Sequence, residues 1–497
     1  MKIITMRHIL GNKVLQYDVD DRGIIVDERE IDRTVNPKPQ YRKWVKEHMV
    51  FWYDMSKPVD TYSQNFNDWR PHPSVNADVI ITSTSFVITR FATLNDTVKC
   101  YIPDQTKNFP GMKVEVKGIV DGQELYWGYS ADIKLVNITQ DGTYDIPPLG
   151  TVKGNLSFRN GNIVGACNIT ITQLPSGQSV PTNEILKTNP YLQDHSGNNR
   201  PLKLNNFLFA AMSGVGGYEL NWTDQSIWTR PLGNRFNGAI EPHKLTVTSV
   251  LNSAAIIETQ VPLYAKKFKV KVSGVIDEIV AYIYKDTKGV QQRFDIREDG
   301  EYELPSNYVV EANFNMGWRI FTASYPHTCN ITIEQIPSYP NALVTDGVDD
   351  YGVVENLQQG VKVLFVTINP FIDGKFIYDQ RLNNIKPWLF AVFNDKGSIA
   401  YNSRNSNGKT YIDGTLNEST IVSALLNKKQ IITIVNNDVT GDKTKTPVFF
   451  SNTDHNSGRI SSAFYNSIGF DSVPTKETDG FTEQDLINYV LENLITK

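Results

Sequence analysis

The chain contains the same stretch of sequence twice. Three segments of the first copy recur in the second in the same order and with little change in spacing: KVEVKGIVD at Lys113–Asp121 and KVKVSGVID at Lys269–Asp277, QDGTYDIP at Gln140–Pro147 and EDGEYELP at Glu298–Pro305, CNITITQLPS at 167–176 and CNITIEQIPS at 329–338. Self-similarity of this kind is the signature of a duplicated structural unit. The sequence therefore predicts two domains of one fold, at residues 77–176 and 242–340.

Each copy is written in short segments that alternate polar and apolar residues. The alternation is clear at Lys113–Lys117 and at Asn168–Thr172, and it is the pattern of a strand with one buried face. About seven such segments per copy, separated by turns, are typical of a β-sandwich of immunoglobulin or jelly-roll type.

The C-terminal part of the chain has strand-like segments and one helical segment. Asp413-Gly414 predicts a two-residue hairpin, because both central positions of a type I′ turn need positive φ. In FTEQDLINYVLENL, Thr482 is a candidate N-cap with Asp485 three residues on, and Leu486, Val490 and Leu494 share one helical face. The sequence predicts an all-β chain of several sandwiches with one C-terminal helix.

Composition limits the classes of function. A chain of 497 residues with 40% hydrophobic residues suits three or four folded domains. The net charge of −5 gives no broad positive field for nucleic acid. No run of about 18 apolar residues predicts membrane insertion. The first residues lack an apolar core of the kind found in signal peptides, so we expect assembly in the cytoplasm of the producing cell.

Residues 1–47 differ in texture from the rest. They mix Asp, Glu, Arg and Lys with few apolar positions and are interrupted by Pro37 and Pro39. We expect a solvated arm with one or two short strands, and a second interpretation is a segment that becomes ordered against a partner.

Several segments carry a resemblance to a known family. They are DGVDDYGVV at Asp346–Val354, KFIYDQR at Lys375–Arg381, GKTYIDGTLN at Gly408–Asn417, the terminal GF and TEQDLINYV, FWYDMS at Phe51–Ser56 and NPYLQDHSGNNRPLKLNNF at Asn189–Phe207. These segments resemble a concanavalin A-like (laminin G-type) jelly roll, in the variant common in structural proteins of Bacteroides-infecting, crAss-like tailed phages. The resemblance implies a discontinuous lectin-like domain built from 48–76, 177–241 and 341–497, with both repeats inserted into it.

The resemblance also implies a function. It implies a head or tail fibre or appendage component on the virion surface, which displays lectin-like domains for adhesion to glycans or the host surface. The expected partners are other virion proteins through residues 1–47, host-surface glycans and further copies of the chain. A bacterial cell-surface glycan-binding protein and a polysaccharide depolymerase are the alternatives.

Candidate chemistry is sparse, and we expect no enzyme, no catalytic residues and no cofactor. Paired carboxylates of the E-x-D-x-E kind, which glycoside hydrolysis in this fold would need, have their nearest match at Glu28, Glu30 and Asp32, in the arm. GVGGY at Gly214–Tyr218 lacks the setting of a phosphate loop and predicts a flexible turn. Asp346, Asp349 and Asp350 could supply oxygen ligands to calcium, but a polar turn into a strand is the favoured interpretation, so no metal is expected.

Aromatic residues and cysteines complete the candidates. Tyr126-Trp127-Gly128-Tyr129 could stack on sugars, but Trp127 aligns with Ile283 and Tyr126 with Tyr282, which predicts a buried Trp127. Four further aromatic residues stay open as sugar contacts: Trp222, Trp228, Trp388 and Tyr401. Of the three cysteines, Cys167 and Cys329 hold the same place in the two copies; with Cys100, they are expected to be buried and unpaired.

Overall fold

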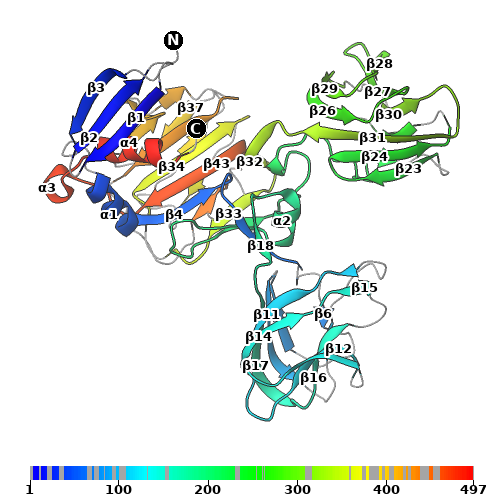
Figure 1. Ribbon diagram of the computed structural model, residues 1–497, viewed down its shortest axis with the longest axis horizontal. Helices are drawn as coiled ribbons and strands as arrows, with labels where there is room; N and C mark the ends of the chain where they lie inside the picture. The colour runs from blue at the N-terminus through cyan, green and yellow to red at the C-terminus, as the bar shows by residue number, and fades with distance from the viewer. Residues whose placement is uncertain are drawn as a thin grey trace.

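The protein consists of a large β-sandwich, two smaller β-sandwiches and a separate N-terminal sheet (Figure 1). The computed structural model describes residues 4–10, 13–19, 25–32, 38–63, 66, 70–71, 78–82, 84–91, 97–99, 108–130, 133–151, 156–229, 235–252, 255–259, 261, 263–307, 316–357, 360–371, 377–379, 391–393, 398–401, 408–417, 421–423, 427–436, 447–451 and 459–495. The predicted all-β fold with several sandwiches and a C-terminal helix is confirmed.

The large sandwich is assembled from segments far apart in the sequence. Its main sheet has the order β21-β32-β43-β34-β41-β38-β39, and β4 pairs with β43 beside β32. The bounds are β4 (Met49–Asp54), β21 (Gly214–Gly216), β32 (Tyr339–Asp346), β34 (Val363–Pro370), β38 (Lys409–Ile412), β39 (Thr415–Asn417), β41 (Gln430–Val435) and β43 (Ser461–Phe470). Strands from both ends of the chain thus share one sheet.

A second sheet of the large sandwich has the order β19-β20-β33-β42-β35. Its strands are β19 (Tyr191–Leu192), β20 (Leu202–Asn205), β33 (Tyr351–Val354), β35 (Tyr378–Asp379) and β42 (Val448–Phe449). A smaller sheet contains β36 (Ala391–Phe393), β37 (Ser398–Tyr401) and β40 (Ile421–Ser423). Phe51, Leu364 and Phe449 are fully buried between the two larger sheets, in one continuous core.

Two helices cover the outer face of the main sheet. They are α1 (Lys38–His48) and α4 (Glu483–Asn493), and Trp44 of α1 packs with Leu486 of α4 against Phe470 of β43. The capping box predicted for the terminal helix is present at Thr482 and Asp485. The remaining described helices, α2 (Asn183–Thr188) and α3 (Lys476–Asp479), are short. No helix in the described ranges is long and apolar enough to cross a membrane.

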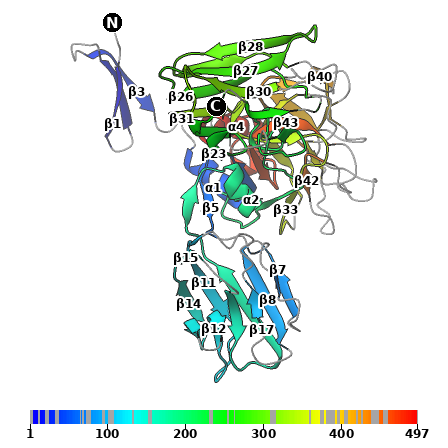
Figure 2. The same ribbon diagram turned by 90° about the vertical axis from the view of Figure 1, so that its right-hand side faces the viewer.

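Helix α1 corrects part of the expectation for residues 1–47. Trp44 and Val45 are buried against the large sandwich, so the end of the supposed arm belongs to that body. The preceding residues form a three-stranded meander rather than one or two strands: β1 (Ile4–Leu10), β2 (Lys13–Val19) and β3 (Ile25–Asp32). This N-terminal sheet projects away from the other bodies in Figure 2.

The two repeats are sandwiches with the same strand order. In the first, the sheets are β14-β11-β17-β8-β7 and β13-β12-β16-β9-β6; in the second, they are β29-β26-β31-β24-β23 and β28-β27-β30-β25-β22. The first contains β6 (Arg70–Pro71), β7 (Asp78–Ile81), β8 (Ser85–Phe91), β9 (Thr97–Lys99), β11 (Met112–Lys117), β12 (Leu125–Ser130), β13 (Ile133–Ile138), β14 (Gly142–Ile146), β16 (Ser157–Asn160) and β17 (Gly165–Gln173), with β10 (Asn108–Phe109) paired to β15 (Leu149–Thr151).

The second repeat begins earlier in the chain than the sequence predicted. Its strands are β22 (Trp228–Thr229), β23 (Phe236–Ile240), β24 (Lys244–Val250), β25 (Ala255–Thr259), β26 (Phe268–Ser273), β27 (Ile279–Lys285), β28 (Gln291–Ile296), β29 (Gly300–Leu304), β30 (Met316–Phe321) and β31 (His327–Ile336). Leu220, Trp222 and Trp228 already lie in its core, and Phe66 lies in the core of the first repeat. Both sandwiches therefore start upstream of residues 242 and 77, because irregular segments without repeated sequence still fill their cores.

Candidate functional site

The chain leaves the large sandwich to form the first repeat and then returns to it. The outgoing and returning segments pair as two short strands, which we call the first hinge. Strand β5 (Val59–Thr61) leads out and β18 (Gly177–Ser179) leads back, and they pair with Thr61 opposite Gly177. Ser176 donates its backbone N–H to the carbonyl of Thr61 at 2.7 Å, next to that pair. The two connections are therefore held together where the two bodies meet.

The loop that follows β19 is held rigidly beside this hinge. Buried Asp194 accepts hydrogen bonds from the backbone N–H of Trp52 (2.9 Å) and of Arg200 (3.1 Å). Asn198 Nδ2 donates to the carbonyl of Met49 at 2.7 Å. The segments FWYD and LQDHSGN, which carry much of the family resemblance, thus fasten one loop to strand β4.

A pocket with a volume of about 330 Å³ lies between the large sandwich and the first repeat. Ten residues line it: Val59, Asp60, Tyr62, Asn189, Tyr191, Gln193, Asn199 and Pro201 from the hinge and the large sandwich, and Thr82 and Thr84 from the first repeat. Its volume falls within the range of small-molecule sites. Both bodies are needed to form it.

The lining is rich in neutral hydrogen-bonding groups. Asp60 Oδ1 accepts from Gln178 Nε2 at 3.0 Å, and no described group donates to the buried Oε1 of Gln193. Burial, and secondarily Asp60, raises the pKa of Tyr62; burial, and secondarily Glu355, raises that of Tyr191. Both phenols therefore stay protonated near neutral pH and can donate hydrogen bonds.

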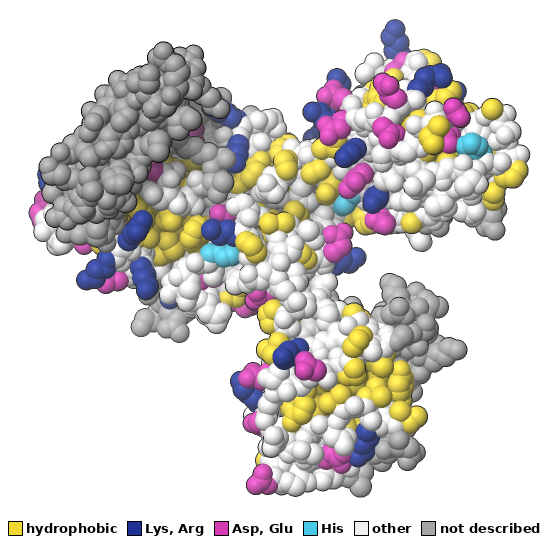
Figure 3. Space-filling model, in the orientation of Figure 1, with side chains coloured by type: hydrophobic (Ala, Val, Ile, Leu, Met, Phe, Trp, Pro, Cys, Tyr) yellow, Lys and Arg dark blue, Asp and Glu magenta, His cyan; other side chains and the backbone are white. Residues whose placement is uncertain are grey.

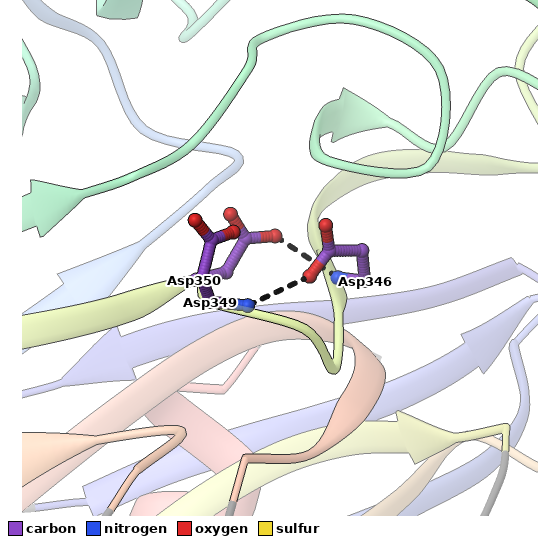
Figure 4. A group of neighbouring side chains, drawn as sticks. All are labelled: Asp346, Asp349 and Asp350. Carbon is purple, nitrogen blue, oxygen red and sulfur yellow. Dashed lines mark hydrogen bonds between the residues drawn. The ribbon is translucent and has the colours of Figure 1, made fainter. Parts of the chain in front are cut away.

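The acidic cluster Asp346, Asp349 and Asp350 builds a turn between β32 and β33 (Figure 4). One carboxylate oxygen from each of the three residues lies within 4.8 Å of the other two. Asp346 Oδ1 accepts from the N–H of Val348 at 2.7 Å, and fully buried Asp350 accepts from Ser213 Oγ and from the N–H of Asp346, both at 2.9 Å. Burial raises the pKa of Asp350 to about 8, so this carboxyl is largely neutral at pH 7. These contacts account for the side chains of Asp346 and Asp350 as parts of the turn.

The aromatic residues singled out in the sequence lie mostly in cores. Trp127 is fully buried, as predicted, and Trp222 and Trp228 are buried in the second repeat. The residue that corresponds to Trp127 is Tyr282, and not Ile283 as the sequence alignment predicted. Trp127 of the first repeat lies opposite Phe158, and Tyr282 of the second lies opposite Trp318 on the equivalent strands. The side chains of Trp388 and Tyr401 lie outside the described part of the chain.

The other sequence candidates do not gather at one place. Glu28, Glu30 and Asp32 lie on β3 of the N-terminal sheet, outside the sandwiches. Gly214–Gly216 is the edge strand β21 rather than a turn. An added Cβ at Gly214 would lie 2.4 Å from Asn183 Oδ1, which explains a glycine there.

The cysteines are less buried than expected. Cys167 and Cys329 are free thiols of intermediate exposure, and Cys100 lies outside the described residues. The Sγ atoms of Cys167 and Cys329 donate to the carbonyls of Ile88 (3.5 Å) and Val247 (3.6 Å), equivalent positions in the two repeats.

No sequence pattern predicted the pocket. Its lining residues come from four separated segments and share no periodicity, so only their position beside the inserted repeat could have drawn attention to them. No family model and no curated protein matches the chain. Among solved structures, a structure of oxalate decarboxylase is 10% identical, covers 64% of this chain and 87% of its own length, and has a TM-score of 0.10. A likeness at that level carries no argument about fold or function.

Proposed function

We propose that this chain is a structural appendage protein of a tailed phage, which displays β-sandwiches on the virion surface for adhesion to host-surface glycans. The observation that carries the proposal is the architecture. Two copies of one sandwich extend from a larger sandwich on paired-strand hinges (Figure 1). An N-terminal sheet projects separately (Figure 2). The resemblance of the large sandwich to lectin-like domains of Bacteroides-phage structural proteins supports it.

The N-terminal sheet is the proposed attachment element. Strands β1 and β3 form its two edges, and an edge strand can pair with a strand of another chain. No other described strand pairs with these three, and a sheet of three strands is marginal by itself, so binding to a partner would stabilise it. Other virion proteins, or further copies of this chain in a homo-oligomer, are the partners we propose.

The described surface fits adhesion to neutral partners better than binding to nucleic acid. On the second repeat, Figure 3 shows Lys and Arg side chains interspersed with Asp and Glu. A phosphate backbone would require a concentrated positive surface. We therefore propose a binding role, without nucleic acid as a partner.

Deletion of residues 1–37 tests the attachment. The deletion must stop before α1, because Trp44 and Val45 belong to the core of the large sandwich. We expect a chain that unfolds like the full-length protein but is absent from purified particles, measured by mass spectrometry and immunogold labelling. A matched control carries a shuffled order of residues 4–32, which keeps charge and composition but removes the strand pattern, and it should also fail to assemble.

Three outcomes would contradict the proposal. Normal assembly of the truncated chain would overturn attachment through the N-terminal sheet. Absence of the full-length chain from particles would overturn the virion assignment and favour a cell-surface glycan-binding protein. Release of reducing ends from capsular polysaccharide by the purified protein would show that the role is enzymatic.

A further inference from the structure

The two repeats are joined to the large sandwich by hinges built on one plan. In the first hinge, β5 pairs with β18, and Thr61 faces Gly177. In the second, β21 pairs with β32, and Gly216 faces Tyr339. Gly177 and Tyr339 follow the repeated CNITI segments at the same distance, so the returning strands of the two hinges can be compared position by position.

A repeated glutamine identifies the residues that face each hinge. Gln173 donates its backbone N–H to the carbonyl of Thr84 at 2.8 Å, and Gln335 donates in the same way to His243 at 2.9 Å. Thr84 and His243 therefore occupy corresponding positions, one residue before β8 and one before β24.

The second hinge is filled by its histidine. The ring of His243 stacks on Tyr218 with centroids 3.7 Å apart and an angle of 7° between planes, and its Nε2 lies 3.4 Å from Asn183 Nδ2. Burial lowers the pKa of His243, so the ring is neutral at pH 7. At the first hinge, Thr84 is smaller, and the pocket of about 330 Å³ is open between the two bodies.

The open pocket has the groups that a sugar ring requires. Tyr62 and Tyr191 offer flat rings for the apolar face of a sugar, while Asp60 offers a carboxylate acceptor for its hydroxyl groups. None of the ten described residues that line it is Lys, Arg or His, so this part of the lining provides no positive charge for an acidic sugar.

We propose that the pocket at the first hinge binds a neutral saccharide, and that the second hinge is its closed counterpart. The sugar would contact the large sandwich and the first repeat together, because both bodies line the pocket. This inference rests on the proposed adhesive function and assigns it a site.

Substitution Thr84→His should close the site by placing an imidazole beside Tyr62. The probes are cellotriose, maltotriose, mannotriose and triacetylchitotriose, titrated into the full-length protein by calorimetry and saturation-transfer NMR, with 3′-sialyllactose as the acidic comparison. We expect saturable binding of at least one neutral probe below ~10 mM and a loss of about tenfold or more in Thr84→His. The matched control, His243→Thr at the other hinge, should bind as the wild type does.

Asp60→Asn is the second variant, because its amide oxygen can still accept from Gln178 and the hinge stays paired. We expect it to weaken binding severalfold, which keeps the proposal testable if Thr84→His fails to fold. No binding of any neutral probe, wild-type affinity in both variants, or tighter binding of 3′-sialyllactose would each overturn the inference. Particle assembly of the Thr84→His chain is measured separately, so failure of the pocket and failure of the virion assignment are distinguishable.

Discussion

The two repeats have the same strands in the same order, yet their outer faces differ. On β13, Ile133 and Leu135 are 53% and 37% exposed, while the corresponding positions of β28 hold Gln291 and Arg293. The guanidinium of Arg293 lies 4.1 Å from the ring centroid of Phe321. The comparison teaches that the shared topology depends on the inward positions, because outward positions tolerate apolar, polar and charged side chains.

The cores of the two repeats also differ, in one buried aromatic pair. The first repeat pairs Trp127 of β12 with Phe158 of β16, and the second pairs Tyr282 of β27 with Trp318 of β30. Ring centroids are 4.7 Å and 5.1 Å apart, respectively. The tryptophan is on β12 in the first repeat and on β30 in the second, but each pair contains one tryptophan and one smaller ring. A close-packed core restricts the total side-chain volume more strictly than the identity of each residue.

Removal of the tryptophan of this pair from either repeat should have the largest effect on the free energy of unfolding. Trp127→Ala should destabilise the first repeat by about 3–5 kcal/mol, and Trp318→Ala should do the same to the second, since each leaves a large cavity in a separate core. Hydrogen exchange read by mass spectrometry should show lost protection in the substituted repeat alone. Equal loss of protection in both repeats would show that their cores are not independent.

A second prediction separates the large sandwich from both repeats by its response to alkaline pH. The pKa of buried Asp350 is about 8, above that of an unfolded aspartate, so the folded state holds a proton that the unfolded chain releases. Its stabilising contribution is complete below about pH 4, falls by about 1.4 kcal/mol per pH unit as pH rises from about 4 to about 8, and is exhausted above about pH 8. Urea unfolding at about pH 6 and about pH 9 should show this loss in the wild type and little of it in Asp350→Asn.

The same turn offers a metal test. If Asp346, Asp349 and Asp350 only build the turn, millimolar Ca²⁺ should leave the melting temperature unchanged at both pH values. A stabilisation that grows with pH would identify a cation site that forms when Asp350 loses its proton.

A third prediction concerns acid and the second repeat. Glu278 is buried beside His327, with 2.7 Å between Oε1 and Nε2, whereas Gly165 holds the position of His327 in the first repeat. Burial acts to raise the pKa of Glu278, but hydrogen bonds from the N–H of Ile276 and from His327 outweigh it and lower this pKa. The stabilisation is present above about pH 4.5 and is lost as pH falls through the lowered pKa.

Calorimetry at about pH 7 and about pH 3.5 checks this acid response. Glu278→Gln should lower the melting temperature of the second repeat at neutral pH and leave it nearly unchanged in acid. A similar effect of the variant at both pH values would contradict an ionised Glu278.

Replacement of outward-facing residues of the first repeat by those of the second should have the smallest effect on stability. The double variant Ile133→Gln, Leu135→Arg gives the first repeat the outward residues of the second, and exposed changes of this kind alter the free energy of unfolding by about 0.5 kcal/mol or less. Urea unfolding provides the measurement. A loss of several kcal/mol would mean that these positions are covered by another part of the assembled protein.

Local patterns in the sequence predicted the structure best. The duplication, the strand alternation, the Asp413-Gly414 hairpin with both residues at positive φ, and the capping box at Thr482 were all predicted and are present. Prediction was weaker where the two repeats differ in loop length. The segment from Gly118 to Leu125 is one residue longer than the corresponding segment from Gly274 to Val280. An alignment without this insertion therefore pairs Trp127 with Ile283 and not with Tyr282. Residues 38–48 were predicted to belong to a charged arm because charged side chains dominate the segment. Among the described residues of α1, only Trp44 and Val45 are buried against the large sandwich, and two apolar residues give no clear helical pattern.

The sequence by itself therefore determined that two equal β-sandwiches exist, which of their positions face inward, and where the last helix begins, because spacing along the chain decides these features. Only the tertiary structure decided that Thr84 leaves a pocket open while His243 fills its counterpart. A pocket is the space that remains between side chains of separate segments, such as Tyr62, Thr84 and Tyr191. Its volume depends on how those segments meet at the hinge, and no periodicity in the chain records that distance.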